Sequence, residues 1–508
     1  MDVLSIVPPL VAVVLAIVTR RVLLSLFLSI WVGGLIAANG NPFGAVAETF
    51  TWMKDVMIDP WNARFLVLIA FLGAGAALLF KTGGTEALIK TFEKRITNGK
   101  RSLLFAYILG ILIFFNDYVN SVIVGNASKD LNARYRVSRE KLAYVLDATA
   151  APMATIGPVS DWIGFQVALI AASFASLSLT DVQPYAMFLQ SIPWNFYAIL
   201  SLLAVLTVIL GKDFGPMAKA EKRARETGKL VDDEAVPLSS VEHDLGEPFE
   251  SEQKASVWYF VLPLVTLIVV GVFGLWYTGG GMEGLSLMEA LENTDVSVAL
   301  TWAAFAMTLV GFIIGLRRGM SLKECEETVL AGIRTMLPAL IIMVLAWSIG
   351  AVVDSLGTAE FVVRLTEGWM TTSLLPLLIF VIAMFISFAT GTSWGTMTIL
   401  TPIAVPLAFT ISGVEFIPIV IGAIFAGAIF GDHISPISDT TVMASIFAGS
   451  DHIAHVTTQI PYALVTASVA GLLYILSAFI GSVIVLLLIG IVLQTFLFRF
   501  FGRRSFYN

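Results

Sequence analysis

Long apolar segments alternate with short polar stretches along almost the whole chain. Many of them are long enough to cross about 30 Å of hydrocarbon, which takes roughly 20 helical residues. The pattern predicts helices near residues 3–18, 22–38, 64–80, 102–127, 141–177, 190–210, 257–276, 296–316, 336–353, 373–408, 416–449, 459–479 and 481–498. With 57% hydrophobic and only 13% charged residues, the chain is predicted to be an all-α polytopic membrane protein.

Two apolar segments, 102–127 and 373–408, have polar residues in the middle. Basic residues flank the first on both sides, in the stretches 81–101 and 128–141. If both stretches face the cytoplasm, the segment between them enters and leaves the membrane on the same side. We therefore predict a re-entrant hairpin at 102–127 with its tip at residues 116–121, and a second hairpin at 373–408 that enters from outside.

The remaining basic residues, which were not used to choose this threading, agree with it. It places 27 of the 30 Lys and Arg residues inside and leaves only Lys54, Arg64 and Arg364 outside. A bias of Lys and Arg toward the cytoplasmic side sets the orientation of membrane proteins. The N-terminus is then predicted to lie outside and the C-terminus in the cytoplasm.

Two other segments, 141–177 and 416–449, are longer than one span needs and share a motif at a proline. Pro158-Val-Ser160-Asp161 in the first recurs as Pro436-Ile-Ser438-Asp439 in the second, 278 residues later. Both segments are predicted to be transmembrane helices broken at the proline. Because the first half of the chain starts outside and the second half starts inside, the halves are predicted to be inverted repeats.

These repeats predict a division of the chain into four parts. Residues 1–211 form the first inverted repeat, 212–255 a cytoplasmic linker, 256–480 the second inverted repeat, and 481–508 an extra C-terminal helix and tail. The linker mixes acidic and basic residues and is interpreted as solvated.

Five acidic residues lie deep in apolar segments or at their breaks: Asp117, Asp147, Asp161, Asp432 and Asp439. An ionised Asp at mid-membrane costs about 2.5–3.5 kcal/mol on insertion scales, so each must be protonated, solvated in a cavity or bound to a cation. A group that alternates between a proton and a metal cation is what ion exchange needs. Asp161 and Asp439 are the predicted Na⁺ ligands and proton carriers, with Asp432 and Asp117 assisting.

Neutral oxygen donors accompany these acids at the hairpin tips and helix breaks. Hydroxyls and amides, with one carboxylate for charge, suit a hard cation such as Na⁺. A helix unwound at a proline also frees backbone carbonyls. The candidates are Asn116, Asn120, Ser121, Ser160, Thr392, Ser393, Ser435, Ser438, Thr440 and Thr441.

Each of these residues also has a purely structural explanation. A membrane Asp can cap a half-helix, an explanation that weighs most for Asp147, and Ser or Thr often bonds back to its own helix. His433 is either a hydrogen-bonded structural histidine or a proton carrier in the coupling. His452 and His455 are interpreted as surface residues near a helix end, where pH sensing is the alternative.

One run of residues is specific enough to suggest a family. Gly431-Asp432-His433-Ile-Ser435-Pro436-Ile-Ser438-Asp439-Thr440-Thr441, with the earlier Asn116-Asp117-Tyr118 and Ala151-Pro152-Met-Ala-Thr155-Ile-Gly157-Pro158, resembles the NhaC-type Na⁺/H⁺ antiporter family over roughly residues 60–480. That family belongs to the ion transporter superfamily. The resemblance implies two inverted repeats, each with a re-entrant hairpin and a broken transmembrane helix, in a homodimer of the prokaryotic plasma (inner) membrane.

The predicted function is therefore secondary active exchange of Na⁺, or Li⁺, for H⁺ by alternating access, without a cofactor. The family also includes exchangers of malate and lactate, so the alternative is a Na⁺/H⁺-coupled exchanger of a small organic acid or amino acid. Asp117 at a hairpin tip would repel an anion, which favours the cation. No nucleophile, metal cluster or phosphate-binding loop in the sequence points to an enzyme, and nothing indicates a nucleic-acid partner.

Overall fold

In the computed structural model, the described part of the chain folds into helices and loops. It comprises residues 3–19, 22–92, 96–114, 117–157, 160, 162, 166–167, 169–170, 173–174, 177, 179, 182–237, 249, 255–285, 289–290, 294–357, 361 and 373–504. Within it the only β-type pairing is an isolated bridge between Pro237 and Asp451. The all-α prediction is confirmed.

Most helices of the N-terminal half lie in the predicted apolar segments, but Pro42–Ile58, Gly84–Phe92 and Gly215–Thr227 lie outside them. The helices of this half are η1 (Val3–Ile6), α1 (Val7–Thr19), α2 (Val22–Ala37), α3 (Pro42–Ile58), α4 (Pro60–Lys81), α5 (Gly84–Phe92), α6 (Gly99–Leu112), α7 (Asp117–Arg134), α8 (Arg139–Ile156), α10 (Pro184–Ser191), η2 (Ile192–Trp194), α11 (Phe196–Leu210) and α12 (Gly215–Thr227).

The C-terminal half continues in the same way. Its helices are α14 (Trp258–Thr278), η3 (Gly281–Glu283), α16 (Val296–Arg317), α17 (Leu322–Thr335), α18 (Leu337–Ser355), α20 (Leu375–Thr390), α21 (Ser393–Ser412), η5 (Val414–Phe416), α22 (Ile417–Ile434), α23 (Asp439–Ala448), α24 (His452–Leu476) and α25 (Val483–Arg504).

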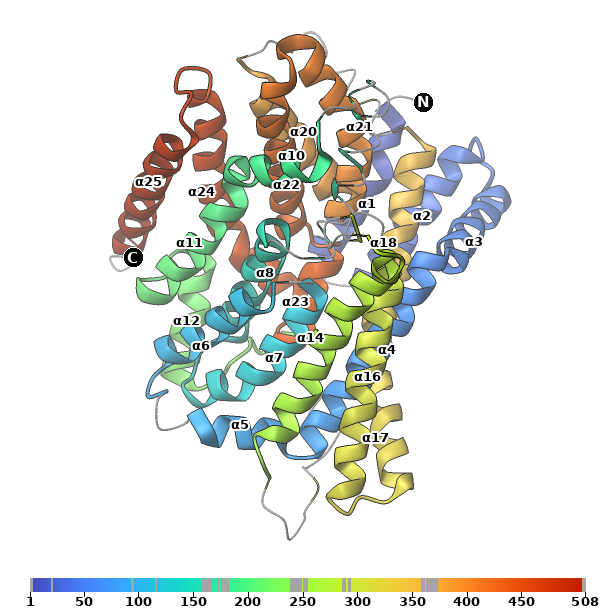
Figure 1. Cartoon of the computed structure of the whole chain (residues 1–508), viewed down its shortest axis with the longest axis vertical. Coiled ribbons are helices and arrows are strands. Elements are labelled where there is room, and N and C mark those ends of the chain that lie inside the picture. The colour runs from blue at the N-terminus through green and yellow to red at the C-terminus, as the bar shows by residue number, and fades with distance from the viewer. Residues whose placement is uncertain are drawn as a thin grey trace.

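Among the described residues, seven helices are long and apolar enough to cross a membrane, or up to nine if each of two bent helix pairs counts as one span. The protein is therefore a multi-pass membrane protein. Their burial differs widely, because 83% of the apolar window of α22 is inside the protein but only 22% of that of α25. A helix apolar all round is either central or faces lipid. Accordingly α22 lies within the bundle and α25 at its edge (Figure 1).

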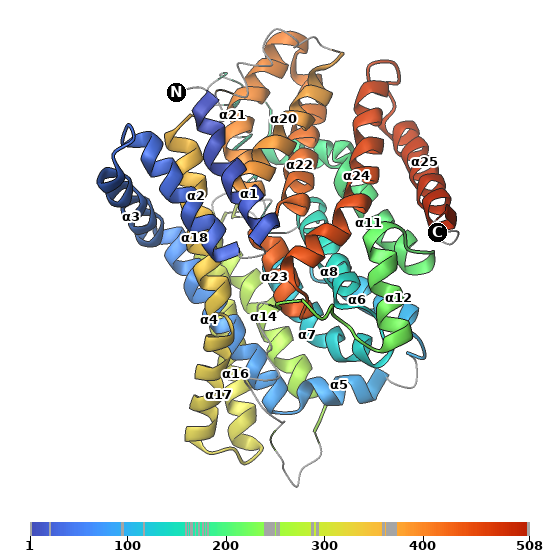
Figure 2. The same cartoon turned by 180° about the vertical axis from the view of Figure 1, so that it is seen from behind.

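Each predicted hairpin consists of two helices with a short break. In the first, α6 packs on α7, and the side-chain amide of Asn120 donates hydrogen bonds to the carbonyl oxygens of Gly110 (2.6 Å) and Ile113 (2.7 Å). In the second, α20 packs on α21 across Gly391 and Thr392. The pairs lie toward opposite ends of the molecule in both views (Figures 1 and 2), as expected if they enter from opposite faces. The inverted repeat itself stays a prediction.

The second long segment is interrupted at its proline. Helix α22 ends at Ile434 and α23 begins at Asp439, with Pro436 between them. Pro436 has no N–H for a helical hydrogen bond, and the Ser438 side chain starts the new helix by accepting from the Thr441 N–H at 3.2 Å. In the first long segment, α8 ends at Ile156, and Pro158 and Asp161 lie outside the described residues.

The first part of the linker packs one face of α12 on the bundle, so its interpretation as solvated is wrong for Phe214, Met217, Ala220, Glu221 and Ala224, which are buried, while most of 225–237 is exposed. Helix α12 contacts α8 and α24. The Glu221 carboxylate accepts from the Ser138 N–H (2.8 Å) and hydroxyl (3.0 Å) at the start of α8. Lys141 of α8 forms an ion pair with Asp213 at 2.7 Å. The sequence shows that this part of the linker is rich in charged residues, but it does not show which of them form ion pairs or hydrogen bonds with the bundle.

One ion pair at the edge of the bundle predicts a pH dependence. Asp295 caps α16 by accepting from the Val298 N–H and pairs with Arg64 of α4 at 2.8 Å. Burial raises the pKa of Asp295, but the Ser297 hydroxyl, the Val298 N–H and Arg64 together hold that pKa below its usual value. The stability this gives is present above the usual pKa and is lost as pH falls through the folded-state pKa.

Asp295→Asn keeps the helix cap but removes the charge. We therefore expect the melting temperature of this variant to fall less than that of the wild type as the pH is lowered. Melting of the purified protein in detergent, followed from about pH 6 downward past the ordinary Asp value of about 3.9, measures it. If the melting temperatures of the wild type and the variant fall equally at acidic pH, the Asp295 ion pair is not the cause of the pH dependence.

Candidate functional site

The two hairpins and the broken helix α22–α23 meet at a buried group of carboxylates. Asp432, at the end of α22, is 0% exposed. Its Oδ2 atom accepts hydrogen bonds from the hydroxyls of Ser393 (3.1 Å), at the tip of the second hairpin, and Thr440 (3.0 Å), in the first turn of α23. Its Oδ1 atom has no hydrogen-bond partner within the described residues. A buried carboxylate with one open oxygen beside neutral hydroxyls has the donor atoms that a hard cation prefers.

Asp439, the first residue of α23, faces the first hairpin. Its carboxylate accepts from the Tyr118 hydroxyl at 2.7 Å and from the Thr440 N–H at 2.8 Å. Asp117, beside Tyr118 at the start of α7, is 1% exposed and close enough to Asp439 for their charges to interact. Asp439 also interacts electrostatically with Asp432. Three buried acids therefore share one region between the first hairpin and the helix break.

The second hairpin also reaches the first broken segment. The rings of Trp394 and Trp162 lie edge to face, with centroids 5.5 Å apart, and the Gln166 amide contacts the Met397 sulfur at 3.4 Å. Each hairpin thus contacts a segment of the other half of the chain. Motion of one half relative to the other would change the surroundings of the acids.

Asp147, in the middle of α8, has neighbours of a different kind. It is 1% exposed, and its Oδ2 accepts from the Gln459 amide (2.6 Å) and the Thr441 hydroxyl (3.0 Å). The Nε2 atom of His455 lies 3.9 Å from the same oxygen. Asp147 therefore joins α8, α23 and α24 through side chains, instead of capping a half-helix.

The other predicted site residues divide into those that face the acids and those that bond elsewhere. Ser438 lies 3.1 Å from the Thr440 hydroxyl and thus close to Asp432. Ser160 donates to the Ala154 carbonyl and Ser435 to the Phe388 carbonyl. Ser121 is buried and Thr392 half-buried. Asn116 and Asp161 lie outside the described residues, so their roles stay predictions.

His433 turns away from the carboxylates. Its Nδ1 atom lies 3.0 Å from the Tyr197 hydroxyl of α11, and its carbonyl accepts from the Gln459 amide at 2.7 Å. Its proton-coupling role stays a prediction. Within the described residues, no group of three or more His, Cys, Asp or Glu side chains is arranged to hold a metal ion.

Sequence reasoning misjudged two histidines. His452 and His455 are 2% and 0% exposed, so their interpretation as surface residues is wrong. Their spacing was the available signal, because His452, His455 and Gln459 fall at i, i+3 and i+7 and share one face of a helix. That face meets Asp147 and α23.

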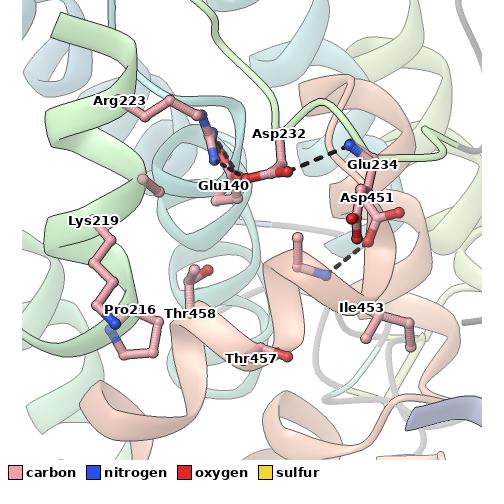
Figure 3. A pocket seen from close by; sticks show the side chains of 13 residues that line it. Glu140, Pro216, Lys219, Arg223, Asp232, Glu234, Asp451, Ile453, Thr457 and Thr458 are labelled. Carbon is pink, nitrogen blue, oxygen red and sulfur yellow. Dashed lines mark hydrogen bonds and ion pairs between the residues drawn. The ribbon is translucent and has the colours of Figure 1, made fainter. Parts of the chain in front are cut away.

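A cavity of about 500 Å³ lies on a different side of α24 from these histidines, where Ala454, Thr457 and Thr458 line it (Figure 3). It lies between the start of α8, α12, the linker and the first two turns of α24. Its polar lining includes Glu140, Lys219, Arg223, Asp232, Glu234, Asp451 and Thr458. Polar atoms from both halves of the chain therefore surround a space within about two helical turns of Asp147.

The tip of the second hairpin depends on a glycine. Gly391 has φ +68°, and a Cβ there would lie 2.6 Å from the Ile437 carbonyl oxygen in the helix break. A left-handed conformation costs a non-glycine residue roughly 1–2 kcal/mol, before any clash. We expect Gly391→Ala to displace Ser393 from Asp432 and lower transport by at least about tenfold. Gly413→Ala, also at positive φ but with open space around its Cβ, is the control; equal losses in the two variants would contradict the tip assignment.

Comparisons with known proteins place the chain in a family. The sequence profile of the Na⁺/H⁺ antiporter family matches residues 153–479, more than half of the chain. This protein belongs to the Na⁺/H⁺ antiporter family. The matched region contains α22, α23 and α24, which carry Asp432, Asp439 and His455.

Individual relatives of this Na⁺/H⁺ antiporter family member differ in how they are described. An uncharacterized protein of Haemophilus influenzae is 35% identical over 490 residues, 94% of this chain and 91% of that protein. The Bacillus subtilis malate-2H⁺/Na⁺-lactate antiporter is 31% identical over 220 residues, 41% of this chain and 43% of that protein. The structure of Neisseria gonorrhoeae MtrF, from a class of antimetabolite efflux pumps, aligns with 87% of this chain and 85% of its own at 15% identity and a TM-score of 0.36. The family is one of secondary transporters.

Proposed function

We propose that the protein exchanges Na⁺, or Li⁺, for H⁺ by alternating access. The observation that carries this proposal is the pair Asp432 and Asp439, both 4% exposed or less, at the point where the two hairpin tips meet the break in α22–α23. Buried acids that interact with each other cannot all be ionised without a counter-charge. A cation supplies that charge in one state, and protons supply it in the other.

The cation would lie beside Asp432. The open Oδ1 atom provides the charge, and the hydroxyls of Ser393, Ser438 and Thr440 provide neutral oxygens. Asp439, held by Tyr118, would gain or lose its proton as the cation leaves or arrives. Because Ser393 comes from a hairpin and Thr440 from the broken helix, relative movement of these elements would open the cation site.

A second candidate function is exchange of a small organic acid coupled to the same ions. The relative that is named a malate-2H⁺/Na⁺-lactate antiporter favours it. An organic anion needs a positive partner, however, and within the described residues no Lys or Arg forms an ion pair with Asp117, Asp147, Asp432 or Asp439. A bound Na⁺ would have to provide that partner.

Transport by the purified protein in liposomes tests both functions. With a pH dye inside, a Na⁺ gradient alone is expected to drive protons in the opposite direction, and a K⁺ gradient is expected to have no effect. Proton movement that requires malate, lactate or an amino acid in addition to Na⁺ would favour the second function. Conduction without exchange, seen as single-channel currents, would overturn both.

A further inference from the structure

A cluster of side chains between α23 and α24 is not used by the proposed cation site. The hydroxyl oxygen of Ser445 lies 3.1 Å from Nδ1 of His452 and 2.9 Å from Nδ1 of His455. It also lies 2.8 Å from the Thr441 carbonyl oxygen one turn earlier in α23. Ser445 and His455 are 0% exposed and His452 is 2% exposed, so all three side chains lie away from bulk water.

The partners of the two Nε2 atoms fix where the ring protons are. His452 Nε2 lies 2.9 Å from the Pro436 carbonyl oxygen, which can only accept. His455 Nε2 lies 3.0 Å from Oε1 of Gln459, and the amide nitrogen of Gln459 is turned toward two acceptors, Asp147 and the His433 carbonyl. Both Nε2 atoms must therefore donate. In the neutral form of each ring, Nδ1 is then an acceptor.

Ser445 cannot satisfy both rings. Its hydroxyl has one proton, and three acceptors face it: Nδ1 of His452, Nδ1 of His455 and the Thr441 carbonyl. With both rings neutral, at least one Nδ1 lone pair points at an oxygen lone pair in a buried place, which is unfavourable. One added proton removes the conflict, because an Nδ1–H on one ring donates to the Ser445 oxygen while the Ser445 O–H donates to the other ring.

We infer that His452 and His455 form a binding site for one exchangeable proton, shared through the Ser445 hydroxyl. A proton from water adds to the Nδ1 lone pair of one ring, no other covalent bond changes, and the cluster gains one positive charge. The Asp147 carboxylate, 3.9 Å from His455 Nε2, balances that charge. Two protons would complete the hydrogen bonds as well, but they would place two cations side by side in a buried site.

The groups around the pair favour a single positive charge. Asp147 of α8 and Asp451, directly before His452, are acidic, and α20, which also packs on α24, has no titratable side chain. The other titratable or charged groups on elements packed against α24 include Asp432 and His433 of α22, Asp439 of α23, Tyr197 of α11, Arg139, Glu140, Lys141 and Tyr144 of α8, Lys219, Glu221, Lys222, Arg223, Arg225 and Glu226 of α12, and Arg499 and Arg503 of α25.

The cavity in Figure 3 gives the pair a neighbouring polar space. It is lined by Asp451 and Thr458, which flank the two histidines in α24, and the Thr458 hydroxyl donates to the His455 carbonyl at 2.8 Å. Glu140, Asp232 and Glu234 add acidic side chains to its wall. His452 and His455 do not line this cavity themselves, but the residues next to them in α24 do.

The assignment of this proton to the exchange cycle rests on the proposed function, but the site itself does not. His455 contacts Asp147 and Gln459, and Thr441 links Asp147 to α23, two residues after Asp439. In the proposed exchange cycle, His452 and His455 would thus hold a proton in one state, while Asp432 holds the cation. Loss of exchange and loss of the proton site are separate observations.

Nitrogen NMR of ¹⁵N-histidine-labelled protein in liposomes tests the site directly, since the chain has only four histidines. Between about pH 8 and about pH 5, where imidazole titrates, we expect one imidazolium per chain to form within the pair, from two Nε2–H tautomers. His452→Gln and His455→Gln identify the signals. Ser445→Ala is expected to lower the proton affinity of the pair by about tenfold, because a hydrogen bond to a charged group is lost.

His243→Gln, a change of the histidine in the linker, is the control and is expected to leave the pair's signals unchanged. Two rings that stay neutral over the whole range, or a first neutral tautomer that is Nδ1–H, would overturn the inference. If the imidazolium forms but a Na⁺ gradient moves no protons, the site stands and the proposed exchange fails. If exchange proceeds with both rings neutral, the exchange stands and the site fails.

Discussion

Asp432→Asn is expected to abolish Na⁺-driven proton movement, and Asp439→Asn to do the same. The Asn side chain keeps the size and one oxygen of Asp432 but removes the charge that accepts from the hydroxyls of Ser393 and Thr440. An uncompensated charge at membrane depth costs about 2.5–3.5 kcal/mol, so cation affinity should fall by roughly a hundredfold or more. Uptake of radioactive Na⁺ and binding calorimetry on the purified variants measure the two effects.

The two variants should differ in one respect. Asp432 would contact the cation, so its loss should weaken Na⁺ binding at every pH. Asp439 would carry the proton beside Tyr118, so Asp439→Asn should leave a larger share of Na⁺ binding but remove its dependence on pH. Asp354→Asn, the same change at an exposed residue at the end of α18, is the control and should transport like the wild type. Full exchange by Asp432→Asn would disprove the proposed cation site.

The break in α22–α23 could be predicted because its causes are local. Pro436 removes a helical donor, and Ser438 is a favourable first residue for a new helix, so the sequence shows both the end and the restart. The same holds for the hairpin tip at Gly391, where a polar stretch interrupts an apolar segment. Membrane helices obey strong local rules, because each backbone group must find its partner within the same helix.

The partners of the acids could not be predicted from these local rules. Tyr118 and Asp439 are separated by 321 residues, and nothing near either residue specifies the other. Asp147 had an equally good explanation as a helix cap until α24 placed Gln459 against it. The inverted repeat suggested that the two proline motifs would be equivalent, but it gave no reason for the second broken helix to meet the first hairpin.

The linker shows the same limit for charged residues. Composition alone made residues 212–237 look solvated, since charges usually face water. The structure instead places Glu221 against the start of α8, and Arg223 beside Glu140 at 2.8 Å. A charged residue stays solvated unless the fold places a side chain of opposite charge, or a hydrogen-bond donor or acceptor, next to it. The ion pairs that hold the linker therefore make a testable claim about stability.

Lys141→Met is expected to destabilise the protein strongly. The Lys141 ammonium lies 2.7 Å from Asp213 and 3.8 Å from Glu221, and the three side chains are 3%, 8% and 4% exposed. Removing the cation leaves the Asp213 carboxylate buried without its ion-pair partner, while Glu221 keeps Arg225 at 2.9 Å, and breaking a buried pair on one side typically costs about 3–5 kcal/mol. Melting in detergent and resistance of the linker to proteolysis measure the change.

Two further variants separate this explanation from a general effect of losing a lysine. Lys229→Met removes a lysine from the exposed pair with Asp233, where side chains are 56% and 74% exposed, and should cost about 1 kcal/mol or less. Adding Asp213→Asn to Lys141→Met removes the unpaired buried charge and should restore part of the lost stability. If Lys141→Met and Lys229→Met melt alike, the buried ion pairs do not hold the linker on α8. If they differ as expected, the linker is a structural part of the bundle that fixes α8, and with it Asp147, against α24.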